Sequence, residues 1–166
     1  MGAKIHFIGH LQTNKVKQVV GKVDLIQSVD SVRLLEAIHK EAEKQQIVQD
    51  ILLELNLAGE ASKSGFSRAE LFNILPKMGK FAHIQLLGFM TIPPICHNPG
   101  ENDKFFQEMY NLSVDITAKK YDNVQVSILS MGMSNDYADA ICCGSSMVRI
   151  GTAIFGARDY SKSNQT

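Results

Sequence analysis

The sequence predicts an α/β fold, and within that class an incomplete (β/α)8 barrel of the TIM type with about six βα units. Apolar runs with strand character alternate with amphipathic helical segments along the whole chain. The first such run is followed by residues 9–14, GHLQTN, which lack the G-x-G-x-x-G turn of a dinucleotide-binding sheet. The 166 residues also fall short of the roughly 200 that a closed barrel needs. An open α/β sheet is the alternative.

Short apolar runs rich in β-branched residues predict six strands. They are Ile5–Ile8, Leu25–Ser28, Ile51–Leu57, Ile84–Thr91, Val124–Leu129 and Met147–Ile150. Because helical segments separate them, the strands are expected to run parallel. Their carboxyl ends should then gather at one edge, where barrels place their binding loops.

Three helices are predicted from apolar periodicity preceded by a capping residue. Asp30-Ser31 precedes Val32–Gln45, Ser67 precedes Arg68–Met78, and Asn102 or Asp103 precedes Lys104–Lys120. Glu70, three residues after Ser67, completes the pattern of a capping box.

Composition limits the possible functions and partners. Seventeen basic residues balance seventeen acidic ones, so no net field draws the protein to nucleic acid or to an anionic membrane. No apolar run reaches the roughly 18 residues of a membrane span, and no signal peptide is apparent. Three cysteines without ligand-like spacing fit a reducing compartment, so we expect a cytoplasmic protein. We expect one domain over residues 1–160 and a polar tail over residues 161–166.

Two neighbouring segments near the C-terminus carry the chemistry of a phosphate site. Residues 130–136, SMGMSND, and 147–156, MVRIGTAIFG, each leave a predicted strand and enter a turn. Gly151 permits close approach of an anion to the backbone, and Thr152 and Ser134 add hydroxyls. Singly, Ser134 is more often a helix cap, Gly151 a turn glycine and Arg149 a structural ion-pair partner. The ordered combination after two successive strands favours phosphate binding.

Five separated motifs, in this order, resemble the pyridoxal phosphate homeostasis proteins, relatives of the alanine racemase N-terminal barrel. They are GHLQTNK at 9–15, SKSG at 62–65, GFMTIP at 88–93, SMGMSND at 130–136 and RIGTAIFG at 149–156. The resemblance covers residues 5–160. It implies a barrel that binds pyridoxal 5′-phosphate (PLP) as a carrier or regulator of intracellular PLP, without catalytic turnover.

The resemblance also implies roles for four of the candidate residues. It assigns the Ser134 hydroxyl, the Gly151 and Thr152 amides and the Thr152 hydroxyl to the PLP phosphate. Arg149 matches the arginine that faces the pyridine nitrogen. A cation there disfavours protonation of that nitrogen, which weakens the ring as an electron sink.

Three further residues are weaker candidates for the cofactor site. Met133 and Met90 are expected to pack near the ring, although a methionine near a strand end is more often part of the core. Asn14, in the loop after the first strand, is a candidate polar contact.

The resemblance implies a PLP held as a Schiff base on a lysine in a V-S-K motif at the end of the first barrel strand. This chain begins where the third strand of the family is expected, and no lysine stands at a matching strand end. We therefore expect no internal aldimine and noncovalent binding at best. The chain could be a fragment, could complete itself with a second copy, or could form an open sheet whose exposed strand edges allow self-association.

Two other functions remain open at this point. One is a PLP-dependent racemase or decarboxylase of the same barrel type, which would need a second domain and a lysine base. The other is a binding module for another phosphorylated metabolite, because any phosphate needs the same donors. The expected ligands are PLP or related B6 vitamers, with no nucleic acid, membrane or metal.

Overall fold

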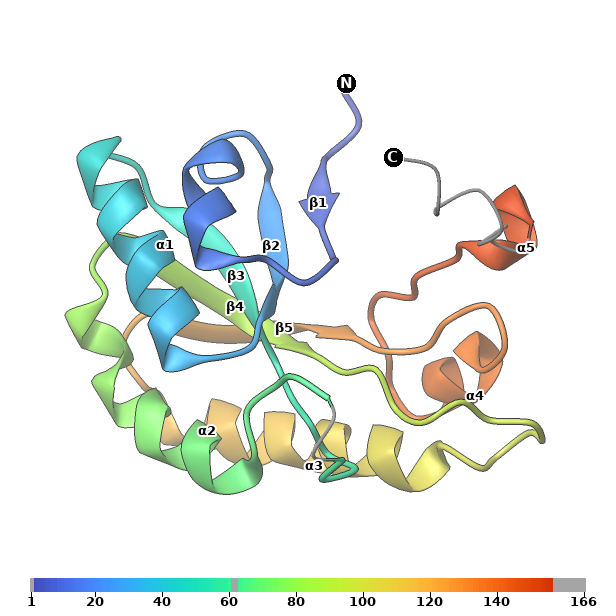
Figure 1. Ribbon diagram of the computed structural model, residues 1–166. Coiled ribbons are helices and arrows are strands. Elements are labelled where there is room, and N and C mark those ends of the chain that lie inside the picture. The colour runs from blue at the N-terminus through green and yellow to red at the C-terminus, as the bar shows by residue number, and fades with distance from the viewer. Residues whose placement is uncertain (1, 61–62, 157–166) are drawn as a thin grey trace.

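The computed structural model describes residues 2–60 and 63–156. Its strands are β1 (His6–Phe7), β2 (Leu25–Val29), β3 (Gln49–Glu54), β4 (Ile84–Met90) and β5 (Val124–Ser130). They form one parallel sheet in the order β1-β2-β3-β4-β5 (Figure 1). In a doubly wound sheet the strand order reverses at a switch point, whereas here it follows the chain. The interpretation as part of a barrel wall is confirmed, with five strands in the sheet.

Helices cover the outer face of this wall (Figure 1). They are α1 (Val32–Lys44), α2 (Arg68–Ile74), the 3-10 helix η2 (Leu75–Lys80) and α3 (Asp103–Lys119). The 3-10 helix η1 (Thr13–Gln18) links β1 to β2, while α4 (Tyr137–Cys142) and α5 (Thr152–Phe155) follow β5. Two predicted caps are confirmed. The Ser31 hydroxyl accepts from the Leu34 amide, and Ser67 and Glu70 form the reciprocal capping box.

The second predicted helix, Arg68–Met78, changes type within its span. The α-helix stops at Ile74 and a 3-10 helix continues to Lys80, with Pro76 in its first turn. Proline has no amide hydrogen for an α-helical bond and its ring clashes with the preceding turn, so it favours a new helical start. The segment still packs on the sheet through Leu75 and Met78, which are buried.

The two faces of the sheet bury different residues. The outer face packs against the helices in one large apolar cluster that includes Ile51, Phe89, Leu35 and Phe106. The inner face has a smaller cluster built around Leu25, Leu52 and Met90, with Leu87 and Ile128 partly buried against it. The alternation follows from the two-residue period of a strand. Residues pointing inward from the strands are therefore the ones that can face a ligand in the barrel.

The sixth predicted strand, Met147–Ile150, is wrong as a strand. Among the described residues a single bridge joins this segment to the sheet, between Ser130 and Met147. Met147 O accepts from the Met131 amide as a parallel ladder requires, but the next amide, that of Arg149, donates to Gly132 O. Gly132 has a φ of +92°, which turns the chain out of the extended conformation and stops the ladder. The segment therefore lies beside β5 without extending the sheet.

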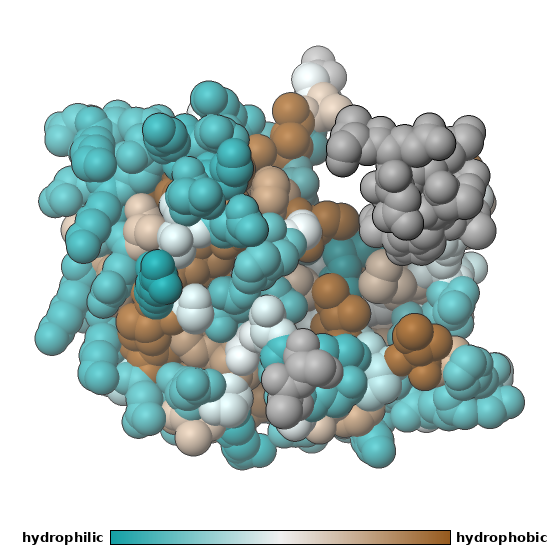
Figure 2. Space-filling view, in the orientation of Figure 1, coloured by the Kyte–Doolittle hydropathy of each residue, from teal (hydrophilic) through white to brown (hydrophobic). Residues whose placement is uncertain are grey.

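Strand boundaries differ elsewhere by one to three residues. The edge strand β1 keeps only His6 and Phe7, and its flanking Ile5 and Ile8 are exposed. In Figure 2 the side over α1 is mainly hydrophilic, and apolar side chains appear near β1. In the described part of the chain no helix has both the length and the apolarity to cross a membrane. The predicted tail at residues 161–166, and residues 157–160 of the predicted domain, lie outside the described residues.

Candidate functional site

The carboxyl ends of the parallel strands meet at one edge of the sheet, which we call the mouth. Polar residues occupy it, as expected for this kind of wall. His10 follows β1, Asp30 follows β2, Glu54 ends β3, Thr91 follows β4 and Ser130 ends β5.

The residues assigned to the phosphate come together at one side of the mouth. The Ser134 Oγ accepts hydrogen bonds from the amides of Gly151 and Ala153, each at 3.3 Å. Gly151 precedes the first residue of α5, Thr152, and a Cβ placed on Gly151 would meet no atom within 4 Å. Ser134, Gly151, Thr152 and Ala153 form what we call the phosphate corner. Its two converging amides and adjacent open space suit an anionic oxygen.

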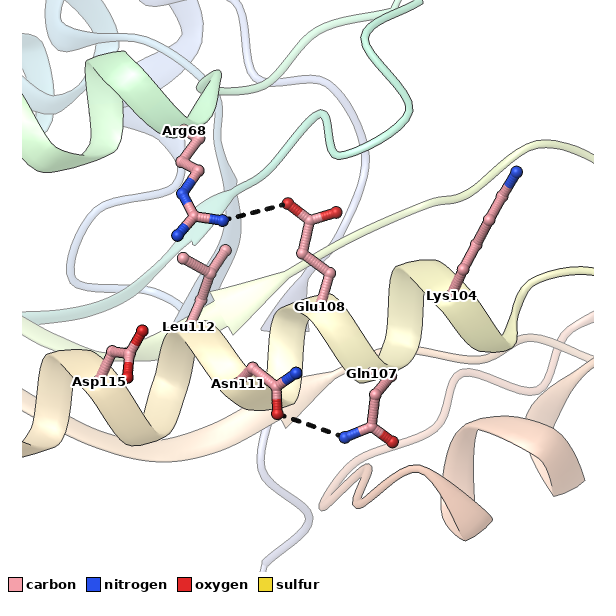
Figure 3. A pocket seen from close by; sticks show the side chains of 7 residues that line it. All are labelled: Arg68, Lys104, Gln107, Glu108, Asn111, Leu112 and Asp115. Atoms are coloured by element: carbon pink, nitrogen blue, oxygen red, sulfur yellow. Dashed lines mark hydrogen bonds and ion pairs between the residues drawn. The ribbon is translucent and has the colours of Figure 1, made fainter.

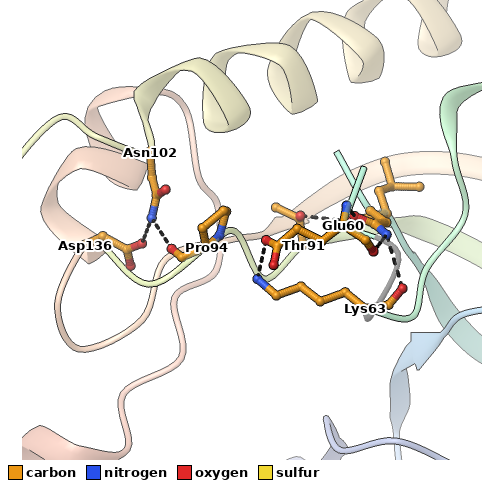
Figure 4. Close-up of polar contacts among 8 residues, drawn as sticks. Glu60, Lys63, Thr91, Pro94, Asn102 and Asp136 are labelled. Atoms are coloured by element: carbon orange, nitrogen blue, oxygen red, sulfur yellow. Dashed lines mark hydrogen bonds and ion pairs between the residues drawn. The ribbon is translucent and has the colours of Figure 1, made fainter. Parts of the chain in front are cut away.

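A buried pair that sequence reasoning missed supports the loop carrying Ser134 (Figure 4). Asp136 Oδ1 accepts from the Met133 amide at 2.7 Å, and its Oδ2 accepts from Asn102 Nδ2 at 2.8 Å. The same Asn102 amide donates to Pro94 O at 3.1 Å. Asn102 was expected as a cap of α3, but its side chain makes no capping bond there. No pattern in the sequence indicates that Asn102 is buried against Asp136, because the residues around Asn102 show no apolar periodicity.

Arg149 points into the mouth and is buried, with 8% of its surface exposed. Its Nη1 donates to Ser130 O and Ser130 Oγ, both at 2.8 Å, and its Nη2 donates to Thr91 O at 2.9 Å. These bonds fix the guanidinium plane between the ends of β4 and β5. Arg149 therefore faces inward and does not lie at an exposed edge of the sheet. Its assignment to the pyridine nitrogen stays a prediction.

Charges across the mouth act on one another. Burial lowers the pKa of the Arg149 guanidinium, and the nearby Glu54 and Asp136 carboxylates oppose that shift. Burial also raises the pKa of the Glu54 carboxyl, and Asp30 raises it further, while Arg149 and His10 pull it down. His10 itself pairs with Asp30, with 3.1 Å between Nδ1 and Oδ2. The ionised form of Glu54 is therefore costly in the folded protein.

We expect Glu54→Gln to gain stability relative to the parent protein as the pH rises. A carboxyl whose pKa is raised by folding contributes stability below its unfolded pKa, and that contribution is lost as the pH passes through the folded pKa. The free energy of unfolding of the parent minus that of the variant should decrease as the pH rises through and above the ordinary glutamate pKa. Urea unfolding of both proteins between about pH 4 and about pH 8 measures this difference. A difference that stays flat or rises with pH contradicts the expectation.

The three weaker candidates lie in different environments. Met133 is 41% exposed and sits in the loop that carries Ser134. Met90 is fully buried in the inner-face cluster with Leu25 and Leu52. Asn14 is exposed in η1, and within the described residues its side chain makes no hydrogen bond to the phosphate corner. Their assignment to the cofactor stays a prediction.

Two of the hollows among the described residues differ in their suitability for a ligand. One of about 330 Å³ opens on the mouth beside Glu54, and is lined by Ile8, Gly9, His10, Glu54, Leu55, Asn56, Lys63, Ser64 and Ile92. Lys63 Nζ there already pairs with Glu60 Oε1 at 2.8 Å (Figure 4). The other, of about 300 Å³, lies between α2 and α3, where Arg68 pairs with Glu108 at 3.8 Å (Figure 3). That outer groove consists of solvated helix side chains, so the mouth is the candidate site.

The sequence and the fold of this chain resemble those of known proteins. The sequence matches the family described as alanine racemase, N-terminal domain, over residues 1–159. The pyridoxal phosphate homeostasis protein of Aquifex aeolicus is 44% identical over 155 residues, which are 93% of this chain and 67% of that protein. The corresponding protein of Escherichia coli is 36% identical over 161 residues, 97% of this chain and 68% of that protein. The chain thus spans about two thirds of the length of these relatives.

Solved structures agree with the sequence matches. The structure of PipY from Synechococcus elongatus with PLP bound has a TM-score of 0.82 and 29% identity, and the match covers 91% of this chain and 69% of that one. A protein from Bifidobacterium adolescentis has a TM-score of 0.85 and 40% identity, over 90% of this chain and 60% of that one. Alanine racemase of Clostridium difficile, at 15% identity and a TM-score of 0.69, shares the fold. The fold of the wall, the family match over nearly the whole chain and a relative that is 44% identical lead to one conclusion. The chain belongs to the pyridoxal phosphate homeostasis protein family.

Proposed function

We propose that the mouth binds PLP without a covalent bond, with the phosphate at the phosphate corner and the pyridine nitrogen toward Arg149. The protein then serves PLP homeostasis as a carrier and not as an enzyme. The observation that carries this proposal is the convergence of the Gly151 and Ala153 amides on one point, the Ser134 Oγ, beside the inward-facing Arg149. A relative of this chain has been solved with PLP bound, which supports the choice of ligand.

The donor set fits the phosphate of PLP. The Gly151 and Ala153 amides, which now donate to Ser134, would donate to a phosphate oxygen, and the Ser134 hydroxyl would be free to donate to it as well. The open space beside Gly151 gives the anion room to approach the backbone. When bound, PLP supplies an aldehyde electrophile and a ring that can take up electrons. Arg149 facing the ring nitrogen keeps a proton off that nitrogen, because two adjacent cations repel. A site of this kind suits storage of the cofactor.

Filling the open space at Gly151 is expected to weaken PLP binding by at least about tenfold. Gly151 has a negative φ, and a Cβ added there would meet no atom within 4 Å. A side chain at this position enters the open space where the phosphate approaches, and Gly151→Val places one there. Isothermal titration calorimetry with PLP and with inorganic phosphate measures the loss. Ser127→Ala, an exposed serine earlier on β5, is the matched surface control and should bind like the parent. Equal affinity of Gly151→Val and the parent protein would exclude the phosphate corner.

Ligand comparison separates PLP from the other candidates. Calorimetry with PLP, pyridoxine phosphate and inorganic phosphate tests whether the ring contributes, and equal affinities would favour a general phosphate-binding module. Borohydride treatment of the PLP complex followed by peptide mapping tests the noncovalent mode, since a single reduced lysine adduct would contradict it. Racemisation of L-alanine above the solvent background would favour an enzyme.

A further inference from the structure

A chain of hydrogen bonds, buried except at its His6 end, crosses the inner side of the wall and ends on Arg149. His6 Nδ1 on β1 lies 3.0 Å from Gln27 Nε2 on β2, and Ser130 Oγ on β5 donates to Gln27 Oε1 at 2.6 Å. Arg149 Nη1 then donates to the same Ser130 Oγ at 2.8 Å. Strands β2 and β5 are not neighbours in the sheet, so the contact between Gln27 and Ser130 spans the concave interior.

The direction of every bond in this chain follows from Arg149. A guanidinium only donates, so Ser130 Oγ must accept from it and send its own hydrogen to Gln27 Oε1. This places the amide nitrogen of Gln27 toward His6, where Nδ1 must accept and the ring hydrogen must sit on Nε2. The Gln27 nitrogen also lies 3.2 Å from Met147 Sδ, in the segment that leads to Arg149. One arrangement of hydrogens satisfies the entire chain.

The burial of these groups makes the arrangement strict. Gln27 has 1% of its surface exposed and Ser130 none. A buried hydroxyl or amide that loses its partner carries the full cost of desolvation, so neither side chain can turn away cheaply. Two apolar side chains could fill the space of Gln27 and Ser130 without this constraint. What the polar pair adds is a fixed orientation for the group bonded to it, Arg149.

The hydrogen bonds of Arg149 use its two terminal nitrogens. Among the described residues, Nη1 and Nη2 donate to Ser130 and Thr91, while Nε donates to none. The bonded side of Arg149 thus faces the ends of β4 and β5.

We propose that Gln27 is a positioning residue that holds Arg149 in register with the ring nitrogen of the bound cofactor, acting through Ser130. The inference rests on the proposed function, since it needs a pyridine ring against Arg149. Gln27 touches no ligand itself. Its amide oxygen fixes the Ser130 hydroxyl, and that hydroxyl leaves a lone pair aimed at Nη1.

The test compares two rings that differ only at the nitrogen. PLP has a lone pair there, whereas N-methylpyridoxal 5′-phosphate has a fixed positive charge and no lone pair. A held Arg149 should favour PLP over the N-methyl analogue by about tenfold or more, because it repels the charge and donates to the lone pair. In Gln27→Leu, Ser130 loses its acceptor and we expect the preference to fall at least about threefold. Affinity for inorganic phosphate should stay within about twofold.

Two matched variants separate positioning from loss of structure. Gln27→Glu keeps an oxygen for Ser130 and should retain more of the preference than Gln27→Leu. Gln125→Leu changes an exposed glutamine of β5 that makes no side-chain hydrogen bond among the described residues, and should behave like the parent. If Gln27→Leu does not fold, Ser130→Ala breaks the same link and is expected to lower the preference similarly.

The outcomes distinguish this inference from the proposed function. If the wild-type protein binds neither PLP nor inorganic phosphate, both the proposed function and the positioning role of Gln27 are wrong. PLP binding with the same preference in the parent, Gln27→Leu and Ser130→Ala removes only the positioning role. A general loss of affinity for all three ligands in Gln27→Leu, with no change in the preference for PLP over its N-methyl analogue, also contradicts it.

Discussion

Replacing Gly88 by alanine is expected to lower the melting temperature by more than about 10 °C, or to abolish folding. Gly88 has a φ of +147°, a backbone angle that residues other than glycine rarely adopt. A Cβ there would overlap the carbonyl oxygen of Ile128 and come within 2.8 Å of its carbonyl carbon. These are backbone atoms of the paired strand β5, so no side-chain rotation relieves the clash. Strands β4 and β5 would have to separate at the register shift between Leu86 and Gly88.

A thermal melt followed by circular dichroism measures the effect, with Gly9→Ala as the matched control. Gly9 has no positive φ and no atom within 4 Å of a Cβ, so its substitution should change stability by less than about 0.5 kcal/mol. Because β4 and β5 hold the two carbonyl groups that bind Arg149, partial folding of Gly88→Ala should also lose ligand binding. A Gly88→Ala protein as stable as Gly9→Ala would show that the strands separate at little cost.

The parts of the fold that the sequence predicts well depend on local chemistry. Ser31 and Ser67 start their helices because a hydroxyl one residue before the helix satisfies a free amide, a signal confined to four residues. The parallel order of strands follows from alternation of strand and helix. Ser134 and Gly151 could be brought together in prediction because each follows one of two successive predicted strands. The second of these, Met147–Ile150, lies beside β5 through a single bridge and so still places Gly151 near Ser134. The combination of motifs, and the resemblance it carries, predicted that Ser134 and Gly151 belong to one site, and the structure brings these two residues into contact.

The parts that could not be predicted depend on contacts between distant residues. Gln27 is a polar residue in an apolar strand, and only the curvature of the wall brings it to Ser130, 103 positions later. Asn102 has the character of a helix cap, yet its amide is used 34 positions away by Asp136. Met147–Ile150 has the composition of a strand, and the turn at Gly132 in its neighbour prevents it from pairing as one. Such tertiary effects override local propensity.

Replacing Arg149 by methionine is expected to lower the free energy of unfolding by about 2 to 3 kcal/mol near neutral pH. Methionine fills a similar volume but donates no hydrogen bond, so Ser130 Oγ and Thr91 O each lose a bond from the guanidinium. Glu54 also loses the cation that lowers its pKa. Urea unfolding at pH 7 measures the change, and a loss below about 0.5 kcal/mol would mean that these bonds are replaced by water.

The loss in Arg149→Met should grow with pH, and this dependence tests the charge coupling separately from the hydrogen bonds. Without Arg149 the pKa of Glu54 rises further, so the variant loses more stability than the parent as the pH passes through the ordinary glutamate range and above. Adding Glu54→Gln to Arg149→Met should remove the pH-dependent part and leave the part due to Ser130 and Thr91. Urea unfolding of the parent, the two single variants and the double variant, at about pH 5 and at about pH 8, gives both parts. If the double variant keeps the same pH dependence as Arg149→Met, the two side chains are not coupled, and the mouth is organised by hydrogen bonds alone.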